Sequence, residues 1–237
     1  MSKEFDFYKG RLVEKIDRLN KRLRKINIGS DIDDTEVAAT ACGVLIVNRM
    51  FGTSFKLSDL KYDLEIDDLI RKYLPDVKDY EKTANDIWNS DEVIRGSLPM
   101  PGVLEVSRFL HRNKIDQIHR ITSRPGRLHD ATLFWYEVNM PWVDKSLIHI
   151  QSNGNEINPQ FKVEQIKKYG INLFFEDLVK HAETISVETN AITVLIPQDS
   201  NKDYKPGSGR IIVVPEDYYP LQPAFVRAYL RLAEIFS

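Results

Sequence analysis

Apolar side chains recur along the first part of the chain with the spacing of a helix. Leu12, Ile16, Leu19 and Leu23 follow one another at intervals of four and three, with lysines and arginines between them. This period predicts an amphipathic helix over residues 4–25. Its basic face could contact phosphate, but a solvated outer face is the simpler interpretation.

Beyond this helix, short apolar runs rich in β-branched residues alternate with longer segments of helical pattern. Such alternation indicates a parallel sheet with helices on both of its faces, which is the α/β class. The predicted strands cover residues 26–32, 116–121, 147–150, 171–175, 191–196 and 210–214. The predicted helices cover residues 36–51, 103–113, 128–138, 161–169, 178–188 and 222–236.

Residues 55–98 break this alternation. Short pieces such as 67–70 and 85–88 mix polar and apolar residues without a strand pattern, and Pro75 interrupts them. Pro99-Met100-Pro101-Gly102 then punctuates the chain before the next helix. We therefore expect a small helical insertion after the first strand.

Composition narrows the class of protein. The chain has 237 residues, which suits one elaborated domain or two small ones, and its net charge of −2 gives no general electrostatic reason to bind membranes or nucleic acids. The single cysteine, Cys42, excludes an intrachain disulfide and a cysteine-based zinc site, and its apolar surroundings favour a core residue. No apolar run approaches the roughly 18 residues of a membrane span, and the charged amino terminus lacks a signal-peptide core, so we expect a cytoplasmic protein.

Candidate chemistry begins where the first predicted strand ends. Asp31 and Asp33 stand two residues apart, and a helical pattern follows them closely. At the carboxyl end of a parallel strand both carboxylates can reach one crevice, where open α/β folds bind ligands. Paired carboxylates there suit Mg²⁺, and an aspartate can also attack phosphorus as a nucleophile. The alternative is that both are turn residues, or that Asp34-Thr35 caps the next helix.

Two further predicted strands also end in polar clusters. Thr122-Ser123 follows one of them, and its hydroxyls and backbone N–H groups suit phosphate oxygens, although a turn with a helix cap would look the same. Glu176-Asp177 follows another. Lys162 begins the helix before that strand and could join a phosphate to Asp31, with the nearby Lys167 and Lys168 as competitors.

These residues supply the parts that phosphoryl transfer needs. We assign Asp31 as nucleophile and Asp33 as the general acid, which later acts as the base that activates water. Asp177 would complete a Mg²⁺ site, with Glu176 as a ligand or as a partner of the ligands.

The ordered set resembles the four motifs of the haloacid dehalogenase-like (HAD) phosphohydrolases, over roughly residues 26–200. That resemblance implies a Rossmann-like three-layer α/β/α core and a Mg²⁺-dependent aspartyl-phosphate mechanism. It also implies that Asp31 and Asp177 bind the metal through carboxylates and Asp33 through its backbone carbonyl. The implied division is a helix over 1–25, a core over 26–39 and 99–215, a helical cap over 40–98 and a closing helix over 216–237. The matching residues are Asp31-x-Asp33-x-Thr35, Thr122, Lys162 and Glu176-Asp177.

Within that superfamily the details look like the 5′(3′)-deoxyribonucleotidase group. The chain departs from the family at Asp34, where glycine is frequent, and at Glu176, where some members have aspartate. The segment 117–121 is also more polar than a central strand should be. The pieces that carry the narrower likeness are the small cap, Leu98-Pro99-Met100-Pro101-Gly102-Val103, Ile121-Thr122-Ser123-Arg124-Pro125, and Phe174-Phe175-Glu176-Asp177 with Ala182.

The expected substrate is a small phosphorylated metabolite, with a nucleoside monophosphate as the first choice. Thr35 and Arg124 are candidates for substrate contact, although Arg124 would equally pair with a carboxylate. Sugar phosphates and polynucleotide ends stay open as alternatives, as does a binding module without catalysis, and the first helix could support a homo-oligomer. Four cap aromatics are candidates for stacking on a base, with packing inside the cap as the favoured alternative: Phe51, Phe55, Tyr62 and Trp88.

Overall fold

A computed structural model describes most of the chain. The described residues are 3–60, 66–115, 117–151, 159–198, 201, 203–215, 218 and 221–236, with side chains from residue 12 onward. Tyr62, one of the aromatic candidates, lies outside them. Within the described part, no helix is both long and apolar enough to cross a membrane.

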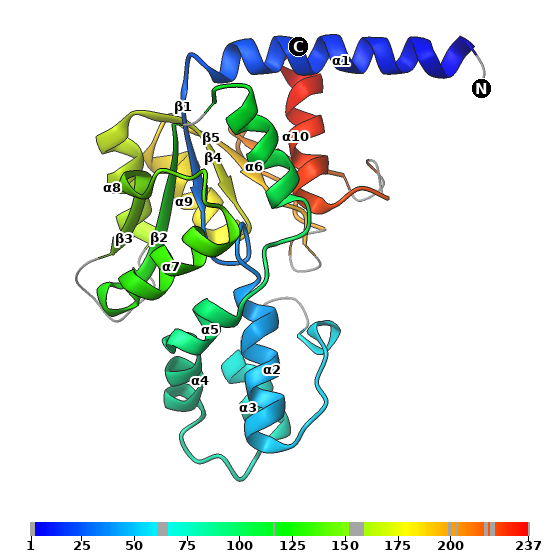
Figure 1. The fold of residues 1–237 in the computed structure, drawn as a ribbon. Coiled ribbons are helices and arrows are strands. Elements are labelled where there is room, and N and C mark those ends of the chain that lie inside the picture. Colours follow the sequence, from blue (N-terminus) through cyan, green and yellow to red (C-terminus); the bar gives the residue numbers. More distant parts are fainter. Residues whose placement is uncertain are drawn as a thin grey trace.

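Six strands form one sheet in the order β3-β2-β1-β4-β5-β6, and every neighbouring pair is parallel (Figure 1). Strands β2 and β3 are added on one side of β1 and strands β4 to β6 on the other, so the strand order reverses between β1 and β4. In a doubly wound fold, ligands bind in the crevice at the carboxyl ends of the two strands at this point. The strands are β1 (Asn27–Asp31), β2 (Ile118–Pro125), β3 (Ile148–Gln151), β4 (Ile171–Glu176), β5 (Ile192–Leu195) and β6 (Ile211–Val213).

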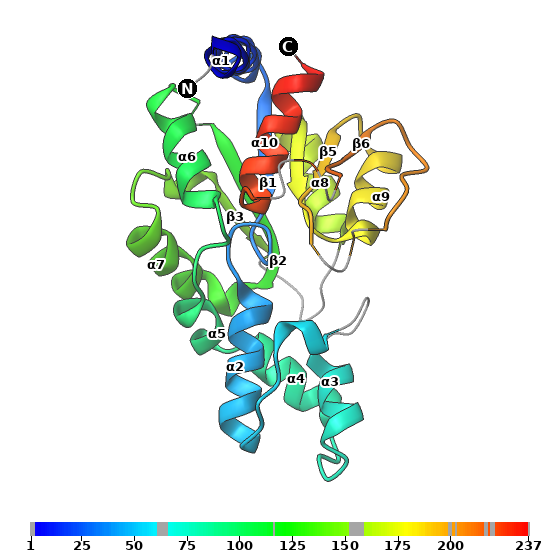
Figure 2. The same cartoon turned by 90° about the vertical axis from the view of Figure 1, so that its right-hand side faces the viewer.

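Helices cover both faces of this sheet, which confirms the predicted α/β class and its three layers (Figure 2). The alternation of β4 shows why: Leu173 and Phe175 pack into one hydrophobic cluster with α6 and α10, whereas Phe174 packs into another with α8 and α9. α1 (Lys3–Leu23) lies across α10, where Tyr229 donates a hydrogen bond to Asn20. The core helices are α6 (Val103–Arg112), α7 (His129–Asn139), α8 (Pro159–Tyr169), α9 (Val179–Glu188) and α10 (Ala224–Ile235), with short 3₁₀ turns η2 (Gly126–Leu128) and η3 (Lys145–Leu147).

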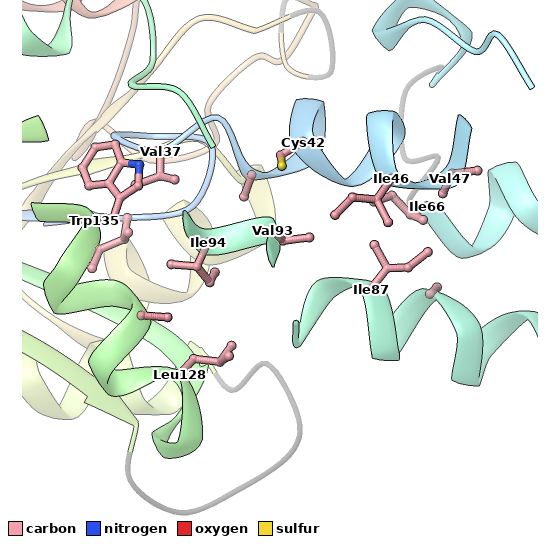
Figure 3. Close-up of a cluster of buried hydrophobic side chains, with 14 of the residues drawn as sticks. Val37, Cys42, Ile46, Val47, Ile66, Ile87, Val93, Ile94, Leu128 and Trp135 are labelled. Atoms are coloured by element: carbon pink, nitrogen blue, oxygen red, sulfur yellow. The ribbon is translucent and has the colours of Figure 1, made fainter. Parts of the chain in front are cut away.

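A separate group of helices lies beyond the carboxyl ends of the strands (Figure 1). Its apolar cluster joins Ile46 and Ile87 within the group to Leu128 and Trp135 of the core, so the two parts share one buried surface (Figure 3). Gly52 ends the first of these helices in a left-handed conformation, which glycine adopts without strain. The group contains α2 (Ala39–Phe51), η1 (Leu57–Asp59), α3 (Ile66–Tyr73), α4 (Tyr80–Trp88) and α5 (Asp91–Gly96).

Two predicted boundaries are wrong by more than two residues. α2 begins at Ala39 rather than at residue 36, because the preceding residues pair with the returning chain: Ala38 N donates to Leu98 O at 2.9 Å and Met100 N donates to Glu36 O at 2.9 Å. β2 runs on to Pro125 instead of ending before Thr122, with an irregular register against β3 from Thr122 onward. The predicted turn is therefore the end of a strand.

Candidate active site

The carboxylates of two neighbouring strands meet at the end of the sheet. Asp31 is the last residue of β1 and Glu176 the last of β4, and the register pairs Ser30 with Phe175, so the two acidic residues come side by side. Asp177 follows at once. One carboxylate oxygen from each lies within 4.8 Å of the others, and all three residues are buried.

Lys162 of α8 points into this group. Its ammonium lies 2.9 Å from Asp31 Oδ1 and 2.8 Å from Glu176 Oε2, and its side chain is 2% exposed. Burial disfavours a charged ammonium, but the carboxylates of Asp31 and Glu176 outweigh it and raise the pKa of Lys162. Lys162 is therefore charged, whereas its competitors Lys167 and Lys168 are exposed at the end of the same helix.

One ammonium does not balance three carboxylates. Burial raises the pKa of Asp31 well above its usual range, and the neighbouring Glu176 and Asp33 add to this against the effect of Lys162. Burial and the same crowding raise the pKa of Asp177. For Glu176, the charge of Lys162 overcomes burial and lowers the pKa to about 2. Oxygen donors with surplus negative charge fit a divalent cation such as Mg²⁺.

Asp177 is held by two further side chains. Thr35 Oγ1 donates to Asp177 Oδ1 at 3.0 Å, and Thr35 is fully buried. Asn201, which the sequence analysis did not single out, donates from Nδ2 to the backbone oxygens of Asp177 and Ile196 at 2.9 and 2.8 Å. Thr35, a candidate for substrate contact, thus contacts a carboxylate and fixes the orientation of Asp177.

Asp33 lies on the opposite side of β1, against β2. Thr122 Oγ1 donates to Asp33 Oδ2 at 3.1 Å, and Arg124 Nε lies 3.0 and 2.9 Å from its two oxygens, with Nη2 as a further donor. Arg124 is buried and also donates to Thr132 Oγ1 at 3.1 Å. The structure therefore shows Arg124 as the partner of a carboxylate, the alternative that the sequence left open. Ser123 is buried between these two residues in β2.

The same face of β2 also carries Arg120, one of the residues that make this strand polar. Arg120 Nε lies 3.4 Å from Glu36 Oε2, Tyr136 OH donates to that oxygen at 2.8 Å, and both charged residues are 3% exposed. Because side chains alternate along a strand, Arg120, Thr122 and Arg124 share one face. They hold the segment after β1 at Glu36 and at Asp33.

Asp34, one of the two residues at which the chain departs from the pattern that it resembles, has a structural role. Its backbone φ is +52°, in the left-handed region, and its carboxylate accepts hydrogen bonds from the backbone and hydroxyl of Thr40 in α2. Burial raises the pKa of Asp34 to about 6, against the effect of those bonds. Gln198 Nε2 donates to Asp34 O at 2.6 Å and supports the turn.

The three aromatic candidates that the structure describes do not gather at this site. Phe51, Phe55 and Trp88 pack, partly buried, against the hydrophobic cluster that joins α2 to the core. Packing is the alternative that the sequence analysis favoured for them.

Comparison with known proteins gives the fold a name. No family model and no curated protein sequence matches the chain. Among solved structures, a hydrolase from Streptococcus pneumoniae TIGR4 matches with a TM-score of 0.51 and 12% identity, over 74% of this chain and 94% of that one. A haloacid dehalogenase-like family hydrolase from Streptococcus pneumoniae matches with a TM-score of 0.51 and 12% identity, over 79% and 93%. The chain therefore has the fold of HAD-superfamily hydrolases, with an acidic cluster at the carboxyl ends of strands β1 and β4.

Proposed function

We propose that this protein is a Mg²⁺-dependent phosphomonoesterase that works through an aspartyl-phosphate on Asp31. One observation carries the proposal: the buried ammonium of Lys162 lies between Asp31 and Glu176, beside Asp177, at the carboxyl ends of β1 and β4. A carboxylate nucleophile there has a positive neighbour that can help hold a phosphoryl group.

The chemical steps balance with two aspartates and one water. An oxygen of Asp31 attacks phosphorus, the bond from phosphorus to the ester oxygen breaks, and Asp33 gives its proton to the leaving oxygen. Asp33 then takes a proton from water, whose oxygen attacks the aspartyl-phosphate and releases inorganic phosphate and the Asp31 carboxylate. The Asp33 side chain is 29% exposed, so a leaving group can reach it.

The donor set fits the metal that the HAD resemblance implies. Asp31 and Asp177 would bind Mg²⁺ through carboxylates and Asp33 through its backbone carbonyl, with Glu176 as a ligand or as a partner of Lys162. When bound, the ion would offset repulsion between these carboxylates and a phosphate.

Phosphate oxygens would be held by Thr122, Ser123 and Lys162. The N–H groups of Lys162 already have acceptors, so contact with a phosphate requires one of these to be exchanged. Thr122 uses its hydroxyl toward Asp33 and accepts from Arg124 N at 3.1 Å. In the proposed complex these residues would exchange partners rather than supply vacant donors.

A nucleoside monophosphate, ribo- or deoxyribo-, is the first substrate to test. The support is the likeness of the residues around Pro99, Thr122 and Glu176 to the 5′(3′)-deoxyribonucleotidase group. The packing of Phe51, Phe55 and Trp88 leaves base recognition to other groups.

The test is phosphate release with and without Mg²⁺ from nucleoside monophosphates, sugar phosphates and a 3′-phosphorylated oligonucleotide. Asp31→Asn keeps the shape of the site but removes the nucleophile, and Asp130→Asn, at a side chain 94% exposed, is the matched control. We expect Mg²⁺-dependent turnover that Asp31→Asn abolishes and Asp130→Asn retains. Turnover that persists in Asp31→Asn, or the absence of turnover on every substrate, would contradict the proposal.

A further inference from the structure

His181 of α9 enters the candidate site from a direction that the four motifs do not cover. The residue is buried, and its Nδ1 lies 3.0 Å from Lys162 Nζ. Its Nδ1 also lies 3.7 Å from Glu176 Oε1, which is too long for a hydrogen bond. Lys162 is therefore its hydrogen-bond partner among these two.

The contact identifies which atom donates. An ammonium has three N–H donors and no acceptor. Its three short contacts are Asp31 Oδ1 at 2.9 Å, Glu176 Oε2 at 2.8 Å and His181 Nδ1 at 3.0 Å. Because Lys162 can only donate, Nδ1 must be the acceptor, and a neutral ring then carries its proton on Nε2.

We propose that His181 is a positioning residue: as a neutral acceptor it takes the third N–H of Lys162 and aims the ammonium at Asp31. The proposal rests on the proposed function of the site. A carboxylate in this place would add a fourth negative charge to a group already crowded with three. An apolar side chain would leave a buried N–H without a partner, at a cost to the native geometry. A neutral imidazole avoids both, so the full charge of Lys162 stays available to Asp31 and to an arriving phosphate.

The matched variants are His181→Asn and His181→Leu. Asparagine carries its amide oxygen on Cγ, the atom that bears Nδ1 in histidine, so it can offer an acceptor in nearly the same place. Leucine fills comparable space without an acceptor. We expect His181→Leu to lower kcat by about tenfold or more with little change in KM, as loss of a supporting partner does, and His181→Asn to recover most of this loss. Thr184→Val removes a hydrogen bond on the exposed side of the same helix and should leave kcat unchanged.

A second measurement tests the proposal without enzyme turnover. The ¹⁵N chemical shifts of the His181 ring should show Nδ1 without a proton and Nε2 with one. A protonated Nδ1 would overturn the proposal, because that atom could not then accept from Lys162. If wild type has no phosphatase activity, the proposed function fails. The ¹⁵N shifts of the His181 ring would still show whether Nδ1 accepts a hydrogen bond from Lys162.

The two proposals separate in the kinetics as well. If His181→Leu has the same kcat as wild type while Asp31→Asn is inactive, the positioning role is refuted and the proposed function stands. Should His181→Leu not fold, His181→Gln replaces it, since its amide lies one carbon farther out and should lower kcat where asparagine does not. Equal losses in the asparagine and glutamine variants would refute the role.

Discussion

Two groups of charged side chains, buried except for the partly exposed Asp33, flank the end of β1, and they differ in their balance of charge. Toward β4, the carboxylates of Asp31, Glu176 and Asp177 share the single ammonium of Lys162. Toward β2, Asp33 faces Arg124 and Glu36 faces Arg120. We call the first the β4-side cluster and the second the β2-side cluster.

This difference separates binding from support. A buried charge without a partner is costly, so the surplus negative charge of the β4-side cluster must be neutralised by protons or by a cation. The raised pKa values of Asp31 and Asp177 reflect the same excess of negative charge. The β2-side cluster has a guanidinium for each carboxylate, so its stability requires neither; Asp33 takes up a proton only in the proposed reaction. We infer that the β4-side cluster is the part of the molecule that responds to a divalent ion, while the β2-side cluster holds the chain after β1 in place.

The largest effect is expected from Lys162→Met, which removes the only cation that the described residues place in the β4-side cluster. Removing one partner of a buried ion pair lowers the free energy of unfolding by about 3–5 kcal/mol. Here two carboxylates lose their partner. Chemical denaturation in EDTA should show that loss of unfolding free energy, and Mg²⁺ should recover part of it. Lys167→Met, at an exposed lysine of the same helix, is the control. A variant as stable as this control would mean that the cluster is not charged as described.

Arg120→Met makes the corresponding change in the β2-side cluster. Glu36 keeps the hydrogen bond from Tyr136 but loses its guanidinium, so we expect a loss of about 3 kcal/mol. Combining it with Glu36→Gln should recover much of this, because the uncompensated charge is then gone. Mg²⁺ should recover none. A clear gain of stability with Mg²⁺ in Arg120→Met relative to wild type would break the distinction between the two clusters.

A smaller effect is expected from Thr35→Val, which keeps the shape but removes the hydrogen bond to Asp177. We expect a loss of about 1–2 kcal/mol in unfolding free energy, the usual cost of an unmade buried hydrogen bond. Because Thr35 supports a proposed metal ligand, the affinity for Mg²⁺, measured by calorimetry, should fall as well. Unchanged Mg²⁺ affinity would show that Asp177 is oriented without Thr35.

The sequence predicted the members of the β4-side cluster better than those of the β2-side cluster. Asp31, Glu176 and Asp177 end or follow strands, and parallel strands deliver their carboxyl ends to one edge, so local pattern implies proximity. Glu36 and Arg120 stand far apart in sequence, and their pairing depends on the face that β2 turns toward the segment after β1. The polarity of residues 117–121 was the only signal of that pairing.

His181 and Asn201 were missed for a related reason. A helical pattern places His181 on α9 but does not say which face of the helix meets Lys162, because that depends on how α8 and α9 pack. Asn201 follows β5 in a segment without periodicity, and its contacts are with backbone oxygens, which leave no trace in side-chain pattern. The α/β class was predictable because buried parallel strands are apolar on both faces.

The last prediction concerns pH, and it compares Asp177→Asn with wild type in EDTA. The folded-state pKa of Asp177 lies above its ordinary value of 3.8, so the folded protein holds that proton more tightly than the unfolded chain does. The resulting stability is present at low pH and is lost as pH rises through the folded-state pKa. Asparagine cannot ionise and still accepts from Thr35. The variant should therefore gain stability relative to wild type as pH rises above 3.8, the ordinary pKa of an aspartate.

Denaturation at several pH values measures this difference, and taking the difference cancels distant groups such as His149, whose pKa burial lowers to about 4. Saturating Mg²⁺ should reverse the order of the two proteins near neutral pH, since the ion stabilises only the form that binds it well. A variant that stays the less stable protein in EDTA at every pH would mean that Asp177 is already compensated. The surplus charge that distinguishes the β4-side cluster would then be absent.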